Sequence, residues 1–97
     1  MYGRIVVFRI LAKTNKLNMN KFFRQFYGYT DYSNNYKYKY ERKGFLDKFP
    51  HIKVIRGVIV VRENDAEEII NFMNEYNAEV WSRSIALSDE DKKILCK

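Results

Sequence analysis

The chain has 97 residues, 46% of them apolar and 31% charged, and this composition is typical of one small folded domain and excludes wholesale disorder. Its longest apolar runs, residues 5–8 and 58–61, are far shorter than the roughly 18 residues that a membrane-spanning helix requires. The net charge is +6, with the excess of Lys and Arg in residues 1–60 and most Asp and Glu after them. We therefore expect a single domain over residues 1–97 with a basic part that attracts polyanions.

The sequence also bears on the compartment. The one cysteine, Cys96, has no cysteine partner for an internal disulfide, and this favours a reducing environment. Arg4 and Arg9 flank a short β-branched run near the start, and no small-residue cleavage site follows it. The sequence therefore predicts an intracellular, cytoplasmic protein without a secretory signal, a cofactor or a metal.

The first half of the chain predicts a strand, a helix, a loop and a second strand. Residues 5–11 are almost continuously apolar, which is typical of a strand covered on both faces. Asn18 is placed to cap a helix whose apolar residues recur at helical spacing, namely Met19, Phe22, Phe23 and Phe26. Gly28 ends this helix, and the polar residues 30–35 predict a loop. Residues 36–42 alternate aromatic with charged side chains, which predicts a strand with one solvent-exposed face.

A connection and a second apolar run follow. Gly44 breaks the alternation, and residues 45–51, which contain the single proline, Pro50, predict an irregular connection. Its apolar side chains are expected to pack against the core. Residues 53–62 are again largely apolar, and they predict one strand at the centre of a sheet.

The last third predicts a helix, a strand and a short helix. Asn64, with Glu67 three residues later, is typical of a capping box and begins a helix that should end near Asn77. Residues 80–87 alternate in a way that predicts a strand. Ser88 precedes three acidic residues, a pattern that favours the first turn of a terminal helix.

This order of elements predicts a ferredoxin-like α+β sandwich with βαββαβ topology. Two right-handed crossovers give a four-stranded antiparallel sheet with two helices on one face, and a short C-terminal helix follows. The face without helices would expose apolar side chains, so we expect it to bind a second copy in a homodimer, or to receive a ligand. The residues expected on that face are Val6, Phe8, Ile10, Val54, Val58 and Val60.

Residues 27–43 contain six of the eight tyrosines, and Lys and Arg are interleaved with them in the second half. Aromatic rings stack on bases, while cationic side chains neutralise phosphates. The leading hypothesis is therefore a sequence-tolerant domain that binds DNA or RNA. The residues predicted to contact nucleic acid are Lys21, Arg24, Tyr29, Tyr32, Lys37, Tyr38, Lys39, Arg42 and Lys43.

The tyrosines have other interpretations, which the sequence leaves open. Tyr36, Tyr38 and Tyr40 share one face of the predicted strand and would there form an aromatic wall on the core side. The three tyrosines before them lie in a polar segment, where the core explains them less readily. Because tyrosine is enriched at protein interfaces, the second hypothesis is a small dimeric protein-interaction or regulatory domain that grips a partner with this tyrosine-rich loop.

Catalytic chemistry has less support in the sequence. General acid and base catalysis needs paired titratable groups, and residues 1–60 hold only three carboxylates and one histidine. The third hypothesis, a metal-dependent nuclease of related fold, would need Asp31, Asp47 and His51 to form a metal site, although their spacing matches no ligand pattern. We therefore predict a non-enzymatic domain without catalytic residues.

Overall fold

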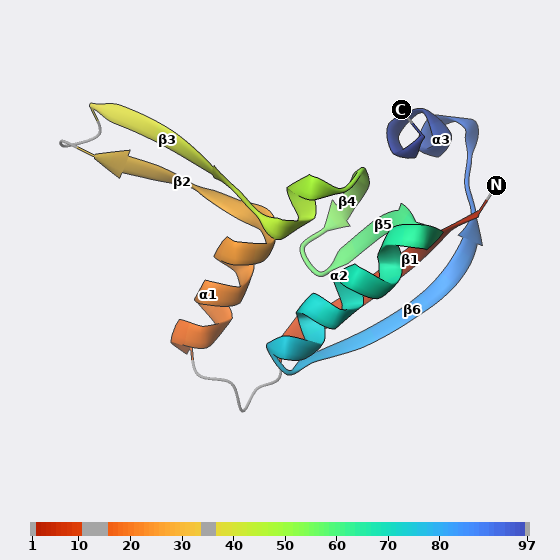
Figure 1. Ribbon diagram of the computed structural model, residues 1–97, viewed down its shortest axis with the longest axis horizontal. Helices are drawn as coiled ribbons and strands as arrows, with labels where there is room; N and C mark the ends of the chain where they lie inside the picture. The colour runs from red at the N-terminus through yellow and green to blue at the C-terminus, as the bar shows by residue number, and fades with distance from the viewer. Residues whose placement is uncertain (1, 11–15, 34–36, 97) are drawn as a thin grey trace.

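A computed structural model describes residues 2–10, 16–33 and 37–96 as an α+β protein (Figure 1). A four-stranded antiparallel sheet has the order β4-β5-β1-β6, and its strands in chain order are β1 (Tyr2–Ile10), β4 (His51–Ile55), β5 (Val58–Arg62) and β6 (Ala78–Ala86). The helices within these ranges are α1 (Lys16–Tyr27), α2 (Glu63–Glu75), α3 (Asp89–Leu95) and the 3-10 helix η1 (Phe45–Lys48). Two more strands, β2 (Gly28–Ser33) and β3 (Tyr38–Lys43), form a separate two-stranded sheet. No helix in the described ranges has the length and apolar character needed to cross a membrane.

Strand β1 occupies the centre of the sheet, as its continuous apolar run predicts. It pairs with β5 on one side, where Val6 lies opposite Ile59, and with β6 on the other. The register turns Val6, Phe8 and Ile10 toward the helices, where all three are buried. The prediction that these three lie on the helix-free face is wrong, because a sequence pattern does not fix which alternate set of a strand faces the core.

Helices α1 and α2 supply the other half of this core. Phe22 and Phe26 of α1 are fully buried, and the ring of Phe26 lies 5.3 Å from that of Phe8 in an edge-to-face contact. Ile69 and Met73 of α2 are also fully buried. The predicted apolar stripe of α1 is therefore confirmed, and its large aromatic area is a main source of stability for this side of the sheet.

Helix α3 covers part of the opposite face of the sheet. Leu95 packs with Val60 and Leu87 in a second, smaller apolar cluster. The predicted start of α3 is confirmed, because the Ser88 hydroxyl accepts a hydrogen bond from the Asp91 amide at 3.1 Å. Apolar side chains on the rest of this face are exposed, and Trp81, for example, is 50% exposed.

The run at residues 53–62 is two strands, and the prediction of one strand is wrong. Arg56 and Gly57 form a turn between β4 and β5, in which Ile55 pairs with Val58. Gly57 has a φ of +93°, a conformation that glycine adopts without steric cost. Strand β4 begins at His51, so it takes its last three residues from this run and only its first residue from the segment predicted as an irregular connection.

The predicted strand at residues 36–42 does not join the main sheet. Tyr36 lies outside the described residues, and β3 pairs with β2, which occupies the segment predicted as a polar loop. The prediction of a strand is confirmed by β3, whereas the expectation that one of its faces packs on the core is wrong, because all six of its residues are exposed. Polar residues form a strand here because β3 offers backbone partners, and pairing of this kind overrides the low strand propensity of the segment.

Two helices, α1 and α2, begin at other residues than the sequence predicts. Helix α2 begins at Glu63 without a side-chain cap, so Asn64 lies within the helix and the predicted capping box is wrong. Asn18 likewise lies inside α1 and not at its start. The predicted end of α2 is confirmed, because the helix stops at Glu75 and Asn77 has a φ of 58°, the left-handed conformation that asparagine tolerates.

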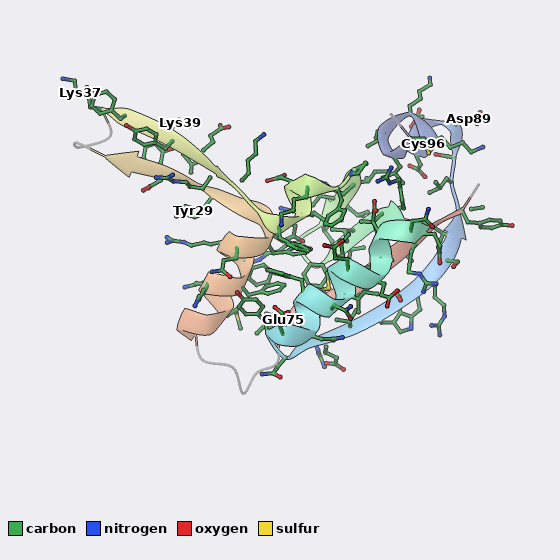
Figure 2. The ribbon with its side chains drawn as sticks, viewed as in Figure 1. Tyr29, Lys37, Lys39, Glu75, Asp89 and Cys96 are labelled. Carbon is green, nitrogen blue, oxygen red and sulfur yellow. The ribbon has the colours of Figure 1, made fainter. Side chains whose placement is uncertain are left out.

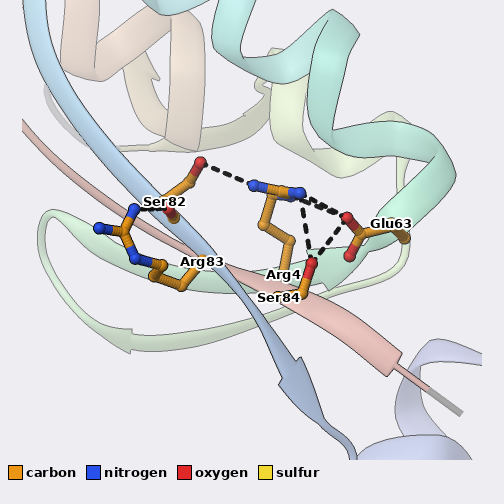
Figure 3. Close-up of polar contacts among 5 residues, drawn as sticks. All are labelled: Arg4, Glu63, Ser82, Arg83 and Ser84. Carbon is orange, nitrogen blue, oxygen red and sulfur yellow. Dashed lines mark hydrogen bonds and ion pairs between the residues drawn. The ribbon is translucent and has the colours of Figure 1, made fainter.

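A polar network holds the start of α2 against the sheet (Figure 3). The Arg4 guanidinium donates to Glu63 Oε1 at 2.6 Å and to the hydroxyls of Ser82 and Ser84 at 3.1 and 3.3 Å. The Ser84 hydroxyl in turn donates to Glu63 Oε1 at 3.0 Å. The hydrogen bond from Arg4 is the main cause that lowers the pKa of Glu63. This network joins β1, β6 and α2, and we assign it a structural role.

Candidate nucleic-acid interface

Strands β2 and β3 form a two-stranded ribbon, the arm, that projects away from the sheet and helices (Figure 1). Its register runs from Gly28 opposite Lys43 to Ser33 opposite Tyr38. All six residues of β3 are exposed, and no third strand pairs with the arm within the described residues. Strand β3 therefore runs along a regular ribbon with its side chains in solvent.

Two glycines allow the strands of the arm to meet at its base. Gly28 has a φ of +83°, and a Cβ there would lie 2.3 Å from the carbonyl oxygen of Arg42. A Cβ at Gly44 would lie 2.3 Å from both the Gly28 nitrogen and the Phe26 carbonyl oxygen. The Gly44 amide also donates to the Asp47 carboxylate at 2.8 Å. The backbone is therefore close-packed where the arm joins α1 and η1.

One face of the arm carries three tyrosines and an arginine. Strand alternation and the register place Tyr29, Tyr38 and Tyr40 on this face together with Arg42 and Asp31. The Arg42 guanidinium lies 5.7 Å from the Tyr40 ring centre and 3.5 Å from the Asp31 carboxylate. Arg42 thus combines a cation–π contact with an exposed ion pair, and both interactions are weak at this exposure.

The opposite face of the arm carries Tyr32 beside Lys39, followed toward the base by Glu41 and Lys43. Tyr32 is exposed, and Lys39 and Lys43 are exposed too. Lys37 comes just before β3 and lies 6.0 Å from the ring centre of Tyr38. Cations are therefore present on both faces of the arm and toward its outer end.

Helix α1 extends this surface next to the base of the arm. The guanidinium of Arg24 lies 4.9 Å from the ring centre of Tyr29. Arg24, Lys21 and Tyr29 line an open cavity of about 680 Å³ together with other residues of α1. All nine residues predicted to contact nucleic acid thus lie on α1, on the arm or beside it, and each of the nine is exposed.

Tyr27, Tyr38 and Tyr40 differ in their burial from the sequence-based expectations. Tyr27 belongs to the core, because its ring stacks on Phe23 and its hydroxyl accepts a hydrogen bond from the Gly57 amide at 3.1 Å. Burial is the main cause that raises its pKa. The interpretation of Tyr38 and Tyr40 as a core-side wall is wrong, because they are 47% and 48% exposed.

Two further cations, which the sequence pattern does not assign to this surface, lie close to it. The Lys53 ammonium lies 4.3 Å from the ring centre of Tyr27, and the Arg56 guanidinium lies 3.7 Å from that of Phe23. Gly57 is the sequence feature that could have predicted their position, because it turns the chain between β4 and β5. They extend the basic surface from the arm onto the adjoining edge of the sheet.

The carboxylates and histidine of the nuclease hypothesis do not meet. Asp31 contacts Arg42 on the arm, Asp47 accepts the Gly44 amide in η1, and His51 Nδ1 lies 2.9 Å from the Phe49 carbonyl oxygen. Among the described residues, no group of three His, Cys, Asp or Glu side chains is arranged to hold a metal ion. The described part of the chain thus does not assemble the metal site that this hypothesis requires.

Most acidic residues lie away from the arm, which itself carries Asp31 and Glu41. Figure 2 shows Lys37 and Lys39 on the arm, whereas Glu75 ends α2 and Asp89 begins α3 on the body of the molecule. The first turns of α2 and α3 are both acidic. A polyanion is therefore attracted to one end of the molecule and disfavoured at the other.

Comparison with known proteins gives no assignment for this arrangement. No protein-family model, curated protein or solved structure matches the chain.

Proposed function

We propose that this protein binds nucleic acid through the arm and the adjoining surface of α1, without a catalytic step. The observation that carries the proposal is the interleaving of exposed tyrosines with exposed cations on a projecting ribbon. Cationic side chains supply the affinity for phosphates, and tyrosine rings and hydroxyls contact bases. The exposed Tyr29, Tyr38 and Tyr40 have no role in the core, so a binding role accounts for them.

We further propose that the body is a ferredoxin-like sandwich into which the arm is inserted. Without the arm, the main elements follow the order strand, helix, strand, strand, helix, strand. The sheet order β4-β5-β1-β6 has the first and third of these strands in the middle, as that topology requires. The arm then lies between the first helix and the second strand, where an insertion leaves the sheet unchanged.

A second copy of the chain is the partner that we propose for the uncovered face of the sheet. Ile55, Val7 and Trp81 are exposed in one row across this face, in which Val7 lies opposite Trp81. Arg9 pairs with Glu79 at 2.6 Å beside the row, so this pair adds no net charge to repel an identical surface. The exposed aromatic and aliphatic side chains are those that form interface cores.

The proposal is tested by fluorescence anisotropy with labelled DNA and RNA over a series of salt concentrations. The test variant changes Lys37, Lys39, Arg42 and Lys43 to Ala, and the control variant changes Lys92 and Lys93 of α3 to Ala. Each cation that neutralises a phosphate of duplex DNA contributes about 0.9 to the slope of log K against log salt. The test variant should thus flatten this slope by about 3 to 4, while the control keeps it.

A complex that does not respond to salt would contradict the proposal and favour the protein-interaction hypothesis. In that case the tyrosines of the arm would bury apolar area against a protein, with little dependence on ionic strength. Cleavage that requires magnesium would instead favour the nuclease hypothesis.

A further inference from the structure

The cations of the arm are distributed in a way that points to the form of its ligand, provided that the proposed function holds. Arg42 lies on the tyrosine face opposite Tyr29, whose ring Arg24 of α1 contacts, whereas Lys39 and Lys43 lie on the opposite face. A protein surface that binds single-stranded nucleic acid needs its cations and aromatic rings on one exposed face only. Here neither face of the arm is covered by another strand of the described residues.

The dimensions of the arm match one groove of one kind of duplex. Each strand has six residues, so the paired part is about 20 Å long at 3.3–3.4 Å per residue. The major groove of B-form DNA is about 12 Å wide and admits a two-stranded ribbon. The major groove of A-form RNA is too narrow for side chains to read. A ribbon inside a groove is flanked by phosphates along both of its edges, so long cationic side chains on either face can reach them.

We infer that the arm inserts into the major groove of duplex DNA. In this arrangement the tyrosine face lies toward the base edges and Arg42 and Arg24 reach flanking phosphates from it, while Lys39 and Lys43 reach flanking phosphates from the opposite face. Tyr38 and Tyr40 approach the base edges, where their hydroxyls donate and accept hydrogen bonds. The acidic first turns of α2 and α3 remain outside the groove.

The first test compares ligands of one sequence by anisotropy at a fixed salt concentration. The ligands are a 20-base-pair DNA duplex, the matching RNA duplex and the separate DNA and RNA strands. We expect the DNA duplex to bind at least tenfold more tightly than each of the others. Equal or tighter binding of a single strand or of the RNA duplex would overturn this inference and leave the proposed function standing. Binding to none of them would overturn both.

The second test asks whether both faces meet phosphates. One variant changes Arg24 and Arg42 to Ala, and the other changes Lys39 and Lys43 to Ala. Each should lower the salt slope on duplex DNA by about 1.8, because each removes two phosphate contacts. If only one of the two variants changes the salt slope, only one face of the arm contacts phosphates, and the inference would be overturned. The variant with Lys92 and Lys93 changed to Ala is the control for a loss of two cations elsewhere.

A competition experiment identifies the groove. Methyl green occupies the major groove and netropsin the minor groove, so the first should displace the protein from the DNA duplex and the second should not. Displacement by netropsin alone would overturn the inference. Thermal unfolding of each variant confirms that it is folded, and we expect unchanged midpoints because the four altered side chains are exposed.

Discussion

Glu63 connects the start of α2 to the sheet, and its charge state controls how strongly it does so. Its carboxylate accepts hydrogen bonds from Arg4 and Ser84, and the side chains of Arg4 and Glu63 are 29% and 40% exposed. Solvent screens a pair of this exposure, so its contribution to the free energy of unfolding is small, about 1 kcal/mol or less. The same contacts lower the pKa of Glu63, and this makes the contribution dependent on pH.

We predict that Glu63→Gln lowers the free energy of unfolding at neutral pH by up to about 1 kcal/mol. The folded-state pKa of Glu63 lies below its ordinary value of about 4.3, so its charge stabilises the fold above that value and this stabilisation is lost as pH falls further. Urea denaturation of wild type and variant at several pH values measures the difference. It should shrink below about pH 4, and a difference independent of pH would contradict the prediction.

At the residue scale, the sequence predicts where aromatic side chains are dense but not which of them are exposed. Tyr27 and Tyr29 are two positions apart in the same polar segment. Tyr27 is the last residue of α1 and packs on Phe23, whereas Tyr29 follows Gly28 and lies on the arm. The positive φ of Gly28 turns the chain between them, and an isolated glycine in a sequence does not reveal its φ.

The arm depends on the contact between Gly28 and Gly44 at its base, since its strands contribute no residue to the apolar clusters of the described residues. An isolated two-stranded hairpin is at best marginally stable in water. The close backbone packing of Gly28 and Gly44, together with the hydrogen bond from the Gly44 amide to Asp47, joins the arm to the body. The base is therefore the part of the arm that is most sensitive to substitution.

We predict that Gly44→Ala destabilises the protein by about 1–3 kcal/mol, because the new Cβ would meet three backbone atoms and the chain must shift. Gly44 has a φ of −95°, which alanine adopts freely, so the effect is one of space alone. Chemical denaturation measures the loss, and amide hydrogen exchange of β2 and β3 should become faster. Thr30→Ala, on the exposed middle of the arm, is the control, and an equal loss there would contradict the prediction.

At the level of elements, the sequence predicts those with strong internal patterns. The strand β1, the apolar stripe of α1, and α3 with its Ser88 cap are confirmed. The arm was predicted only in part, because the alternation at residues 36–42 indicates a strand without indicating its partner. The partner β2 contains Thr, Asp and Ser, which favour loops, and pairing with β3 overrides that preference.

The whole molecule is more extended than a compact domain of its length. Its Cα radius of gyration is 14.9 Å, compared with about 13 Å for a compact domain of 100 residues, because the arm projects from the body. The face of the sheet opposite α1 and α2 is covered at one end by α3 and uncovered along the row of Ile55, Val7 and Trp81. A second copy on this row would leave both arms free.

We predict that the protein sediments at twice its chain mass of 11.7 kDa and that Trp81→Glu sediments at the chain mass. Trp81 is half exposed, so the charge disrupts the interface and leaves the core intact. Analytical ultracentrifugation measures the mass, and an unchanged unfolding midpoint verifies the fold. The control is Tyr2→Glu, which alters an exposed aromatic residue on the opposite face of β1 and should keep the doubled mass. A wild-type protein at the chain mass would contradict the dimer.

The separation of the arm from the core affects how this protein can change during evolution. Most substitutions in a core destabilise a protein, and marginal stability limits how many a lineage tolerates. The exposed side chains of β3 do not pack in either apolar cluster, so mutations there carry little cost in folding. Recognition by the arm can therefore diverge between descendants while the sheet and its helices stay constant.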